Sequence, residues 1–225
     1  MVSKVYKLAA TAVVALVAST SISAASLDFR QEYKHESETY ASRVKIGTGV
    51  GNVYFGVEAM QKGKPFSEWQ SKGNEFDFGY KYKIDDHWTL IPGMPITFFP
   101  GHVTYKPQLR AQYKFDSGLV TKLRYRHEFR QFSDDRSGEQ KSKVTANIDY
   151  NYNGFQFGLE GNYEKGHDDQ KFFNNGDANW DALFKLGYKG EDWNWRPYVE
   201  FANVSVSSTS SDRQLRSRIG ITYSF

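Results

Sequence analysis

The sequence lacks cysteine altogether and has only six prolines and three methionines. A chain without cysteine forms no disulfide, so cross-links cannot supply its stability. It also lacks a strong excess of either charge, because 29 Lys and Arg stand against 26 Asp and Glu. With a net charge of only +3, we expect no nucleic-acid partner. Nor does any part of the chain contain the ~20 consecutive apolar residues that a membrane-spanning helix needs.

The N-terminus has the features of a secretory signal peptide. Two lysines precede the short apolar run L-A-A-T-A-V-V-A-L-V-A at 8–18, and small residues follow as far as Ala25. A basic start, a short apolar core and a small-x-small site are typical of such peptides. We predict cleavage after Ala25, with Ala24 as the alternative. Residues 1–25 would then be the signal peptide, and residues 26–225 a single domain.

Aromatic residues are abundant, at 16% of the chain with 15 Tyr and 17 Phe, and aromatics favour strands. Apolar and polar residues alternate in twelve segments, the pattern of β-strands with one apolar face. These segments are 27–34, 43–46, 53–59, 76–84, 88–92, 105–115, 122–130, 144–152, 155–164, 181–189, 196–201 and 214–225. Because membrane β-barrels alternate lipid-facing with lumen-facing residues, such a chain has no long apolar run.

The connections between these segments alternate in length, as they do in outer-membrane barrels. Tight turns are predicted at 48–52, 85–87, 116–118, 153–154 and 190–192, and polar loops at 35–39, 61–74, 95–102, 132–141, 165–179 and 205–212. Aromatic residues gather next to the tight turns, where amphipathic rings suit the lipid headgroup level. We predict an all-β fold: a transmembrane antiparallel β-barrel of twelve strands, in the bacterial outer membrane, with both termini periplasmic.

A secreted soluble barrel, with its apolar face inward, is the alternative that the strand pattern leaves open. Such barrels typically have eight strands around a ligand-sized interior. They are not expected to carry aromatic girdles, and a lysine or arginine on the polar face of nearly every strand is better used in a lumen. The membrane barrel is therefore the favoured interpretation.

Basic residues on the polar face predict what a twelve-stranded lumen, on the order of 10 Å across, would conduct. Strands six and seven carry Lys106, Arg110, Lys114, Lys122, Arg124, Arg126 and Arg130 against Glu128 alone. Strands twelve, one and two carry Arg216, Arg218, Arg30, Lys34, Arg43 and Lys45 against Asp28 and Glu32. Half a turn separates the two groups, which predicts two opposed basic tracks. Each arginine could instead pair with a neighbouring acid and only stiffen the wall.

Fixed positive charge in a confined channel concentrates anions, and guanidinium groups grip carboxylates bidentately. A narrow lumen with a ladder of such groups favours an anionic, linear ligand, and an acidic oligosaccharide fits better than an inorganic ion. Tyr54 and Tyr198 on the lumen face could stack on sugar rings or simply fill space.

Four stretches resemble the oligogalacturonate-specific monomeric porin (KdgM-like) family, which includes a sialic-acid channel. They are L-R-Y-R-H-E-F (123–129), T-A-N-I-D-Y-N-Y (145–152), W-R-P-Y-V-E-F-A-N-V-S (195–205) and D-R-Q-L-R-S-R-I-G-I-T-Y-S-F (212–225). The resemblance implies a monomer with two opposed basic tracks that passes acidic oligosaccharides, and places Arg124, Arg126, Arg196, Arg216 and Arg218 in matching stretches. It does not distinguish galacturonate from alginate or sialic-acid oligomers.

The predicted translocation residues are therefore Arg30, Arg43, Lys45, Lys106, Arg110, Lys122, Arg124, Arg126, Arg130, Arg196, Arg216 and Arg218. Outer-membrane lipid is another expected partner. The barrel assembly machinery is expected too, since the chain ends in a predicted strand whose last residue is the aromatic Phe225. No cofactor or metal is expected.

An enzyme and a structural or adhesive barrel are the rival functions. An enzyme needs a nucleophile beside a base, and no serine has a histidine at a suggestive position in the sequence. His127 falls on the lipid-facing side of its strand, and the other histidines lie in turns or loops. We therefore expect no enzymatic activity. A side-chain-filled lumen would favour the structural barrel.

Overall fold

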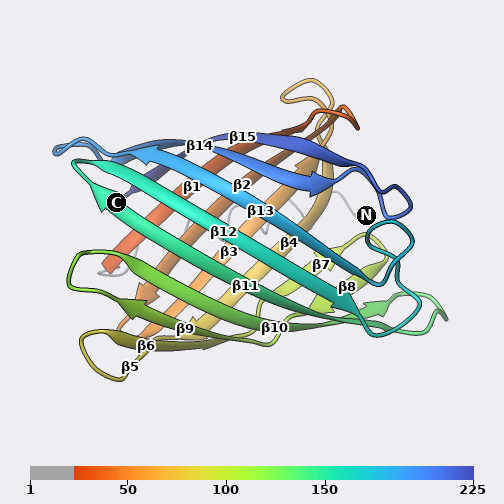
Figure 1. Ribbon diagram of the computed structural model, residues 1–225, viewed down its shortest axis with the longest axis horizontal. Helices are drawn as coiled ribbons and strands as arrows, with labels where there is room; N and C mark the ends of the chain where they lie inside the picture. Colours follow the sequence, from red (N-terminus) through yellow and green to blue (C-terminus); the bar gives the residue numbers. More distant parts are fainter. Residues whose placement is uncertain (1–22) are drawn as a thin grey trace, which may run out of the picture.

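The fold is all-β in the computed structural model, which describes residues 23–225 (Figure 1). Most of the predicted signal peptide lies outside the described residues, and only its last three residues begin the first strand. Among residues 23–225, no helix is long and apolar enough to cross a membrane.

Fifteen strand segments form twelve barrel strands, because three barrel strands are each interrupted once. The uninterrupted ones are β1 (Ser23–Lys34), β2 (Thr39–Val50), β3 (Val53–Lys62), β10 (Val120–Phe132), β11 (Glu139–Tyr152), β12 (Phe155–Gly166), β13 (Ala178–Tyr188), β14 (Trp195–Ser205) and β15 (Arg213–Ser224). The interrupted ones are β4 (Gln70–Tyr80) with β5 (Tyr82–Lys83), β6 (Trp88–Gly93) with β7 (Ile96–Phe99), and β8 (His102–Tyr105) with β9 (Gln108–Lys114). The predicted twelve-stranded antiparallel barrel is confirmed.

The barrel closes by pairing its first strand with its last. β1 and β15 are antiparallel from Ser26 opposite Ser224 to Lys34 opposite Arg216. All the other ladders are antiparallel too, and β10 joins β11 to complete the ring. Closure leaves no strand edge with unpaired N–H and C=O groups, which a bilayer could not satisfy.

Two prolines interrupt the ladder on one side of the ring, since proline has no N–H to donate. Pro95 separates β6 from β7, and Pro107 separates β8 from β9. The prolines still accept through their carbonyls, Pro95 from Lys106 N at 2.9 Å and Pro107 from His127 N at 3.0 Å. The strands therefore run on past each break.

The predicted loop at 95–102 is wrong, because most of it is strand. Ile96–Phe99 and His102–Tyr105 pair with each other across a two-residue turn. Gly101 has φ +86° there, in the left-handed region that glycine tolerates best. Closely spaced Pro95, Pro100 and Gly101 are typical of a loop in the sequence. In the structure the residues between the two prolines form a strand, with Thr97 buried and Phe98 exposed.

The two faces of the wall have opposite chemistry. Large apolar side chains stand exposed on the outside, among them Leu123 (56%), Leu159 (55%) and Ile219 (64%). The charged side chains buried to 9% exposure or less, Glu128 and Glu200, lie on the inward parity of their strands. A soluble barrel would hide the first group and expose the second, so this arrangement excludes it.

The two ends of the barrel differ, and we call them the turn end and the loop end. The turn at 153–154 and the C-terminus lie at the turn end (Figure 1). Longer connections such as 167–177 and 206–212 lie at the loop end. In the turn after β5, the Asp85 carboxylate accepts hydrogen bonds from the backbone N–H groups of Trp88 at 2.6 Å and His87 at 2.8 Å. These two bonds, that from Trp88 first, hold the pKa of Asp85 below its usual value.

Aromatic rings form a belt around the turn end, as the sequence predicts. The belt includes contacts of Trp88 with Tyr113 at 4.9 Å between centroids and Trp195 with Tyr223 at 4.5 Å. Tyr223 also contacts the terminal Phe225 at 4.8 Å. Such rings suit the boundary between hydrocarbon and headgroups.

Two tyrosines lie flat against the inner wall over glycines. Tyr198 of β14 covers Gly220 of β15, and Tyr54 of β3 covers Gly79 of β4. A Cβ added at Gly220 would lie 2.3 Å from Tyr198 Cζ, and one at Gly79 would lie 2.6 Å from the Tyr54 hydroxyl oxygen. Glycine is needed at both positions because a tyrosine ring fills the place of its side chain.

Replacing Gly220 by alanine should destabilise the barrel by about 1–3 kcal/mol, because Tyr198 would have to leave its position. Urea unfolding in lipid vesicles, followed by tryptophan fluorescence, measures this change. Gly161→Ala is the matched control, since nothing lies within 4 Å of its added Cβ. Equal stability of the two variants would contradict the packing argument.

Candidate functional site

Three cavities follow one another through the lumen and share residues. The loop-end cavity of about 300 Å³ and the middle cavity of about 430 Å³ are both lined by Arg30, Arg43 and Arg218. The middle cavity and the turn-end cavity of about 510 Å³ are both lined by Arg110. Cavities lined by cationic side chains therefore occur at both ends and in the middle of the lumen.

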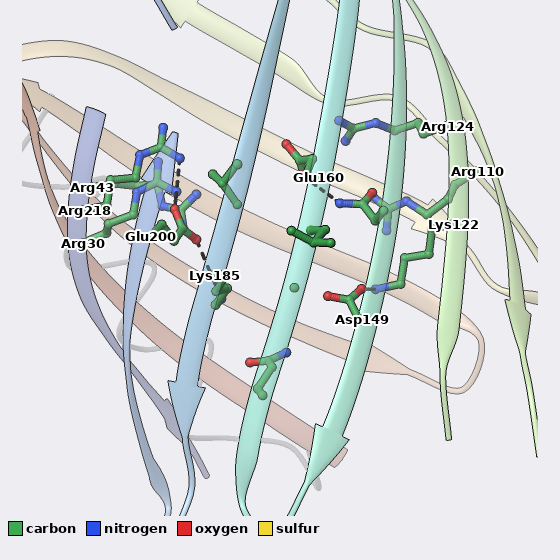
Figure 2. A pocket seen from close by; sticks show the side chains of 15 residues that line it. Arg30, Arg43, Arg110, Lys122, Arg124, Asp149, Glu160, Lys185, Glu200 and Arg218 are labelled. Carbon is green, nitrogen blue, oxygen red and sulfur yellow. Dashed lines mark hydrogen bonds and ion pairs between the residues drawn. The ribbon is translucent and has the colours of Figure 1, made fainter. Parts of the chain in front are cut away.

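The middle cavity lies between two walls that carry opposed arginines (Figure 2). The seam wall consists of β14, β15, β1 and β2, and presents Arg30, Arg43 and Arg218. The far wall consists of β8, β9 and β10, and presents Arg110 and Arg124. Because β1 and β10 lie half a turn apart in the strand order, the structure places these arginines on opposite sides of the lumen.

Carboxylates neutralise most of the charge on the seam wall. Glu200 of β14 lies 3.1 Å from Arg218 Nη1, 3.8 Å from Arg30 Nη1 and 3.9 Å from Lys185 Nζ. Glu32 of β1 lies 2.7 Å from Arg218 Nε and 3.9 Å from Arg216 Nε. Glu200 thus contacts cations of three different strands, and Glu32 contacts two arginines of β15.

The same holds for Arg43, whose guanidinium lies 2.6 Å from Asp28 and 3.5 Å from Glu58. Asp28 also accepts hydrogen bonds from Tyr198 at 3.0 Å and from Thr222 at 2.8 Å. Because Asp28 accepts from three side chains, this network holds Arg43 against the wall rather than leaving it to a ligand.

Tyr198 belongs to that network and has no ring face free for a sugar. It is 3% exposed, with Gly220 beneath it and Lys185 Nζ 3.9 Å from its ring centroid. Tyr54, by contrast, lines the turn-end cavity. Of the two predicted stacking residues, the structure keeps only Tyr54 at a cavity surface.

The far wall has cations without acid partners. Within residues 23–225, no carboxylate oxygen lies within 4.0 Å of the side-chain nitrogens of Arg110 or Arg124. Arg124 donates one hydrogen bond, to Thr145 Oγ1 at 3.0 Å. Arg126 donates to Gln108 at 2.8 Å and lies 3.7 Å from Glu128. The uncompensated positive charge of the middle cavity is therefore concentrated on this wall.

Four other predicted cations are each paired with a carboxylate that stands one or two strands away. These pairs are Lys45–Asp77 (3.2 Å), Lys106–Glu75 (2.8 Å), Lys122–Asp149 (2.8 Å) and Arg130–Glu139 (2.5 Å). The last predicted residue, Arg196 near the turn end, donates only to Gln156 at 3.5 Å. The wall-stiffening alternative thus applies to these four pairs.

Sequence reasoning places Glu200 near arginines but does not identify Glu58 and Glu75 as neutralising acids. Glu58, Glu75 and Glu200 lie on the polar faces of their strands, so their inward direction could be predicted. Their partners could not, because the register between strands decides which side chains meet. Lys72 was assigned to a loop, yet it lines the loop-end cavity.

The chain matches the family model described as "Oligogalacturonate-specific porin protein (KdgM)" over residues 18–225. It is 32% identical to the oligogalacturonate-specific porin KdgM of Dickeya dadantii, over 96% of this chain and 98% of that protein. It is 33% identical to the uncharacterized protein YiiY of Salmonella typhimurium, over 92% of each chain.

Two solved porins have the same fold. KdgM in complex with disordered oligogalacturonate superposes with a TM-score of 0.68 at 26% identity, over 89% of this chain and 99% of that one. The NanC porin superposes with a TM-score of 0.77 at 21% identity, over 88% and 98%. At that identity, the NanC likeness concerns the fold alone.

Replacing Glu200 by glutamine should raise anion selectivity, because it removes the negative charge that Arg30, Arg218 and Lys185 share. The reversal potential in a KCl gradient measures the shift. Stability should fall by about 1–3 kcal/mol, less than for a fully dry ion pair because the lumen holds water. Glu191→Gln, in an exposed turn, is the control. The same selectivity shift in both variants would show that Glu200 does not neutralise the lumen.

Proposed function

The chain belongs to the oligogalacturonate-specific porin (KdgM) family, and from this premise we propose that it passes oligogalacturonate-like acidic oligosaccharides into the periplasm. It is an outer-membrane porin by its barrel and its relatives. One observation carries the choice of ligand: the middle cavity presents Arg110 and Arg124 to the lumen without any carboxylate partner.

Free guanidinium groups suit a polyuronate for two reasons. Each forms two parallel hydrogen bonds to a carboxylate, and such charge-assisted bonds are roughly twice as strong as neutral ones. Confinement in a narrow lumen adds to their field, which raises the local concentration of anions. Transport also requires release, and neighbouring sites that bind similarly let a chain of carboxylates move on by exchange.

The twelve predicted translocation residues then contribute unequally. Arg110 and Arg124 bind ligand carboxylates, with Arg126 and Arg196 as neighbours that hold mainly neutral partners. Arg30, Arg43, Arg216 and Arg218 line the path and form its electrostatic wall, although acids share their charge. Lys45, Lys106, Lys122 and Arg130 are ion-paired and act chiefly on the shape of the wall.

Other acidic sugars, such as sialic acid or alginate oligomers, also present carboxylates, and the NanC porin has this fold. A purely structural or adhesive barrel is the other candidate. The lumen contains three cavities that share lining residues, which argues against a lumen filled by side chains. We infer a monomer, since the family resemblance implies one.

We infer no enzymatic activity and no cofactor. Ser142 on the outer wall does meet two histidines, with its Oγ 2.8 Å from His167 Nε2 and 3.2 Å from His127 Nδ1. The same hydroxyl lies 3.0 Å from the Tyr125 hydroxyl, so it is fully engaged in hydrogen bonds. This cluster joins the 167–177 loop to β10 and β11, which is a structural role.

Loss of Arg110 and Arg124 should weaken ligand binding in the lumen. In planar bilayers, trigalacturonate added to the wild-type channel should block the current, and the Arg110→Gln, Arg124→Gln double variant should shorten each block about tenfold or more. The Lys122→Gln, Asp149→Asn variant is matched, because it removes a paired cation and leaves the net charge unchanged. Equal shortening in both variants would contradict the role of unpaired arginines.

We propose further that residues 1–25 are removed on export, that the termini are periplasmic, and that outer-membrane lipid and the barrel assembly machinery are partners of the mature chain 26–225. An epitope placed in the loop 133–138 should bind antibody on intact cells. One placed in the turn 116–118 should bind only after permeabilisation, and the reverse result would invert the orientation. The intact mass should correspond to residues 26–225.

A further inference from the structure

At the loop end, the unpaired cations stand on β15, β1 and β4. Lys34 and Lys72 line the loop-end cavity and, within residues 23–225, form no ion pair within 4.0 Å. Arg216 lines the same cavity, and its contact with Glu32 is long, at 3.9 Å. Glu58 also lines this cavity, but it is paired with Arg43. An anion that arrives from this end therefore meets three cations whose one ion pair, among residues 23–225, is the long contact of Arg216 with Glu32.

The opposite side of the loop end is electrically different. Arg130 lies 2.5 Å from Glu139, and Lys141 lies 2.9 Å from Glu164 and 3.6 Å from Glu128. Three carboxylates thus surround two cations. A carboxylate ligand would have to displace an acid already in place, so this side offers it no favourable site.

The 167–177 loop also covers that side. Gln170 and the side chains of Glu128, Arg130 and Lys141 enclose a remnant cavity of only about 10 Å³. Phe172 lies over the same lysine, with Lys141 Nζ 5.4 Å from its ring centroid. The loop therefore occupies the space into which a ligand would otherwise reach.

Hydrogen bonds hold the loop in place at both of its ends. On one side, Gln140 N donates to Asp168 Oδ2 at 2.6 Å, and the Gln170 amide donates to Gln140 O at 3.1 Å. On the other, Asn174 N and Asn175 N donate to the 206–212 loop at 3.0 and 2.9 Å. With backbone groups of both neighbours engaged, the covered side is a fixed part of the mouth.

Deeper in the lumen the unpaired charge changes sides. Arg110 and Arg124 of the far wall face the middle cavity, and Lys143 of the adjacent β11 also lacks an ion pair among the described residues. Arg30 and Arg218 of the seam wall line both the loop-end cavity and the middle cavity. Acids already contact both arginines.

We propose that the anion path is staggered: an acidic oligosaccharide enters along Lys34, Lys72 and Arg216, then crosses the lumen to Arg110 and Arg124. The two predicted basic tracks thus act as two half-tracks, the first on β15, β1 and β4 and the second on the far wall. This proposal rests on the proposed function and adds an entrance site with named residues. A ligand with several carboxylates can hold both half-tracks while it crosses, which favours oligomers over monomers.

Side-specific block of single channels tests the stagger. In about 1 M KCl the Debye length is roughly 3 Å, so only direct contacts affect the probe. For trigalacturonate added at the loop end, the association rate with the Lys34→Gln, Lys72→Gln variant should be lower than with the wild type by about fivefold or more. Added at the turn end, it should associate with this variant as with the wild type.

Lys141→Gln is the control, with a cation removed at the same end on the covered side. Its loop-end association rate should stay within about twofold of wild type. Lys141→Gln, Glu164→Gln removes the ion pair as a whole and should give the same result if the first control folds poorly. Equal slowing on both sides would overturn the stagger and support two full tracks. No block of the wild-type channel would instead overturn the proposed function.

Discussion

The structure depends on one constraint: within a bilayer, every backbone N–H and C=O must find a partner in the protein itself. A closed antiparallel ring satisfies it, and β1 paired with β15 is the ladder that completes the ring. Alternation follows from closure, since successive side chains point to opposite faces of a strand. Even the interruptions at Pro95 and Pro107 obey the constraint, because neighbouring strands donate to the proline carbonyls.

The same closure sets the electrostatics of the lumen. Side chains from all twelve barrel strands point into one narrow space, where charge is costly to leave unmatched. Many cations there have acid partners on nearby strands, as Glu200 and Glu32 show on the seam wall. Against that background, the few unmatched cations stand out. In the proposed function these cations bind the ligand, whereas acids lie within 4.0 Å of the paired cations.

Much of this architecture follows from the sequence, because alternation is a local property. The twelve barrel strands, the inward direction of residues such as Arg110, and the aromatic belt near Trp88 are all predictable. Ion-pair partners are not, since they depend on register between strands that local patterns do not encode. The strand at Ile96–Phe99 was missed because flanking prolines and a glycine imitate a loop. The course of the 167–177 loop follows from contacts with β11 and the 206–212 loop, which are distant in sequence.

The seam between β1 and β15 has a consequence for how the protein is made. Its two strands are the first and the last of the barrel to leave the ribosome, so the ladder that seals the wall is the last one possible. Contacts so distant in sequence form slowly, and the chain must wait with both edges open. A nonsense mutation shortly before Arg213 would remove β15 and leave the edges of β1 and β14 unpaired. In this molecule, completeness of the polypeptide is itself a condition for being a channel.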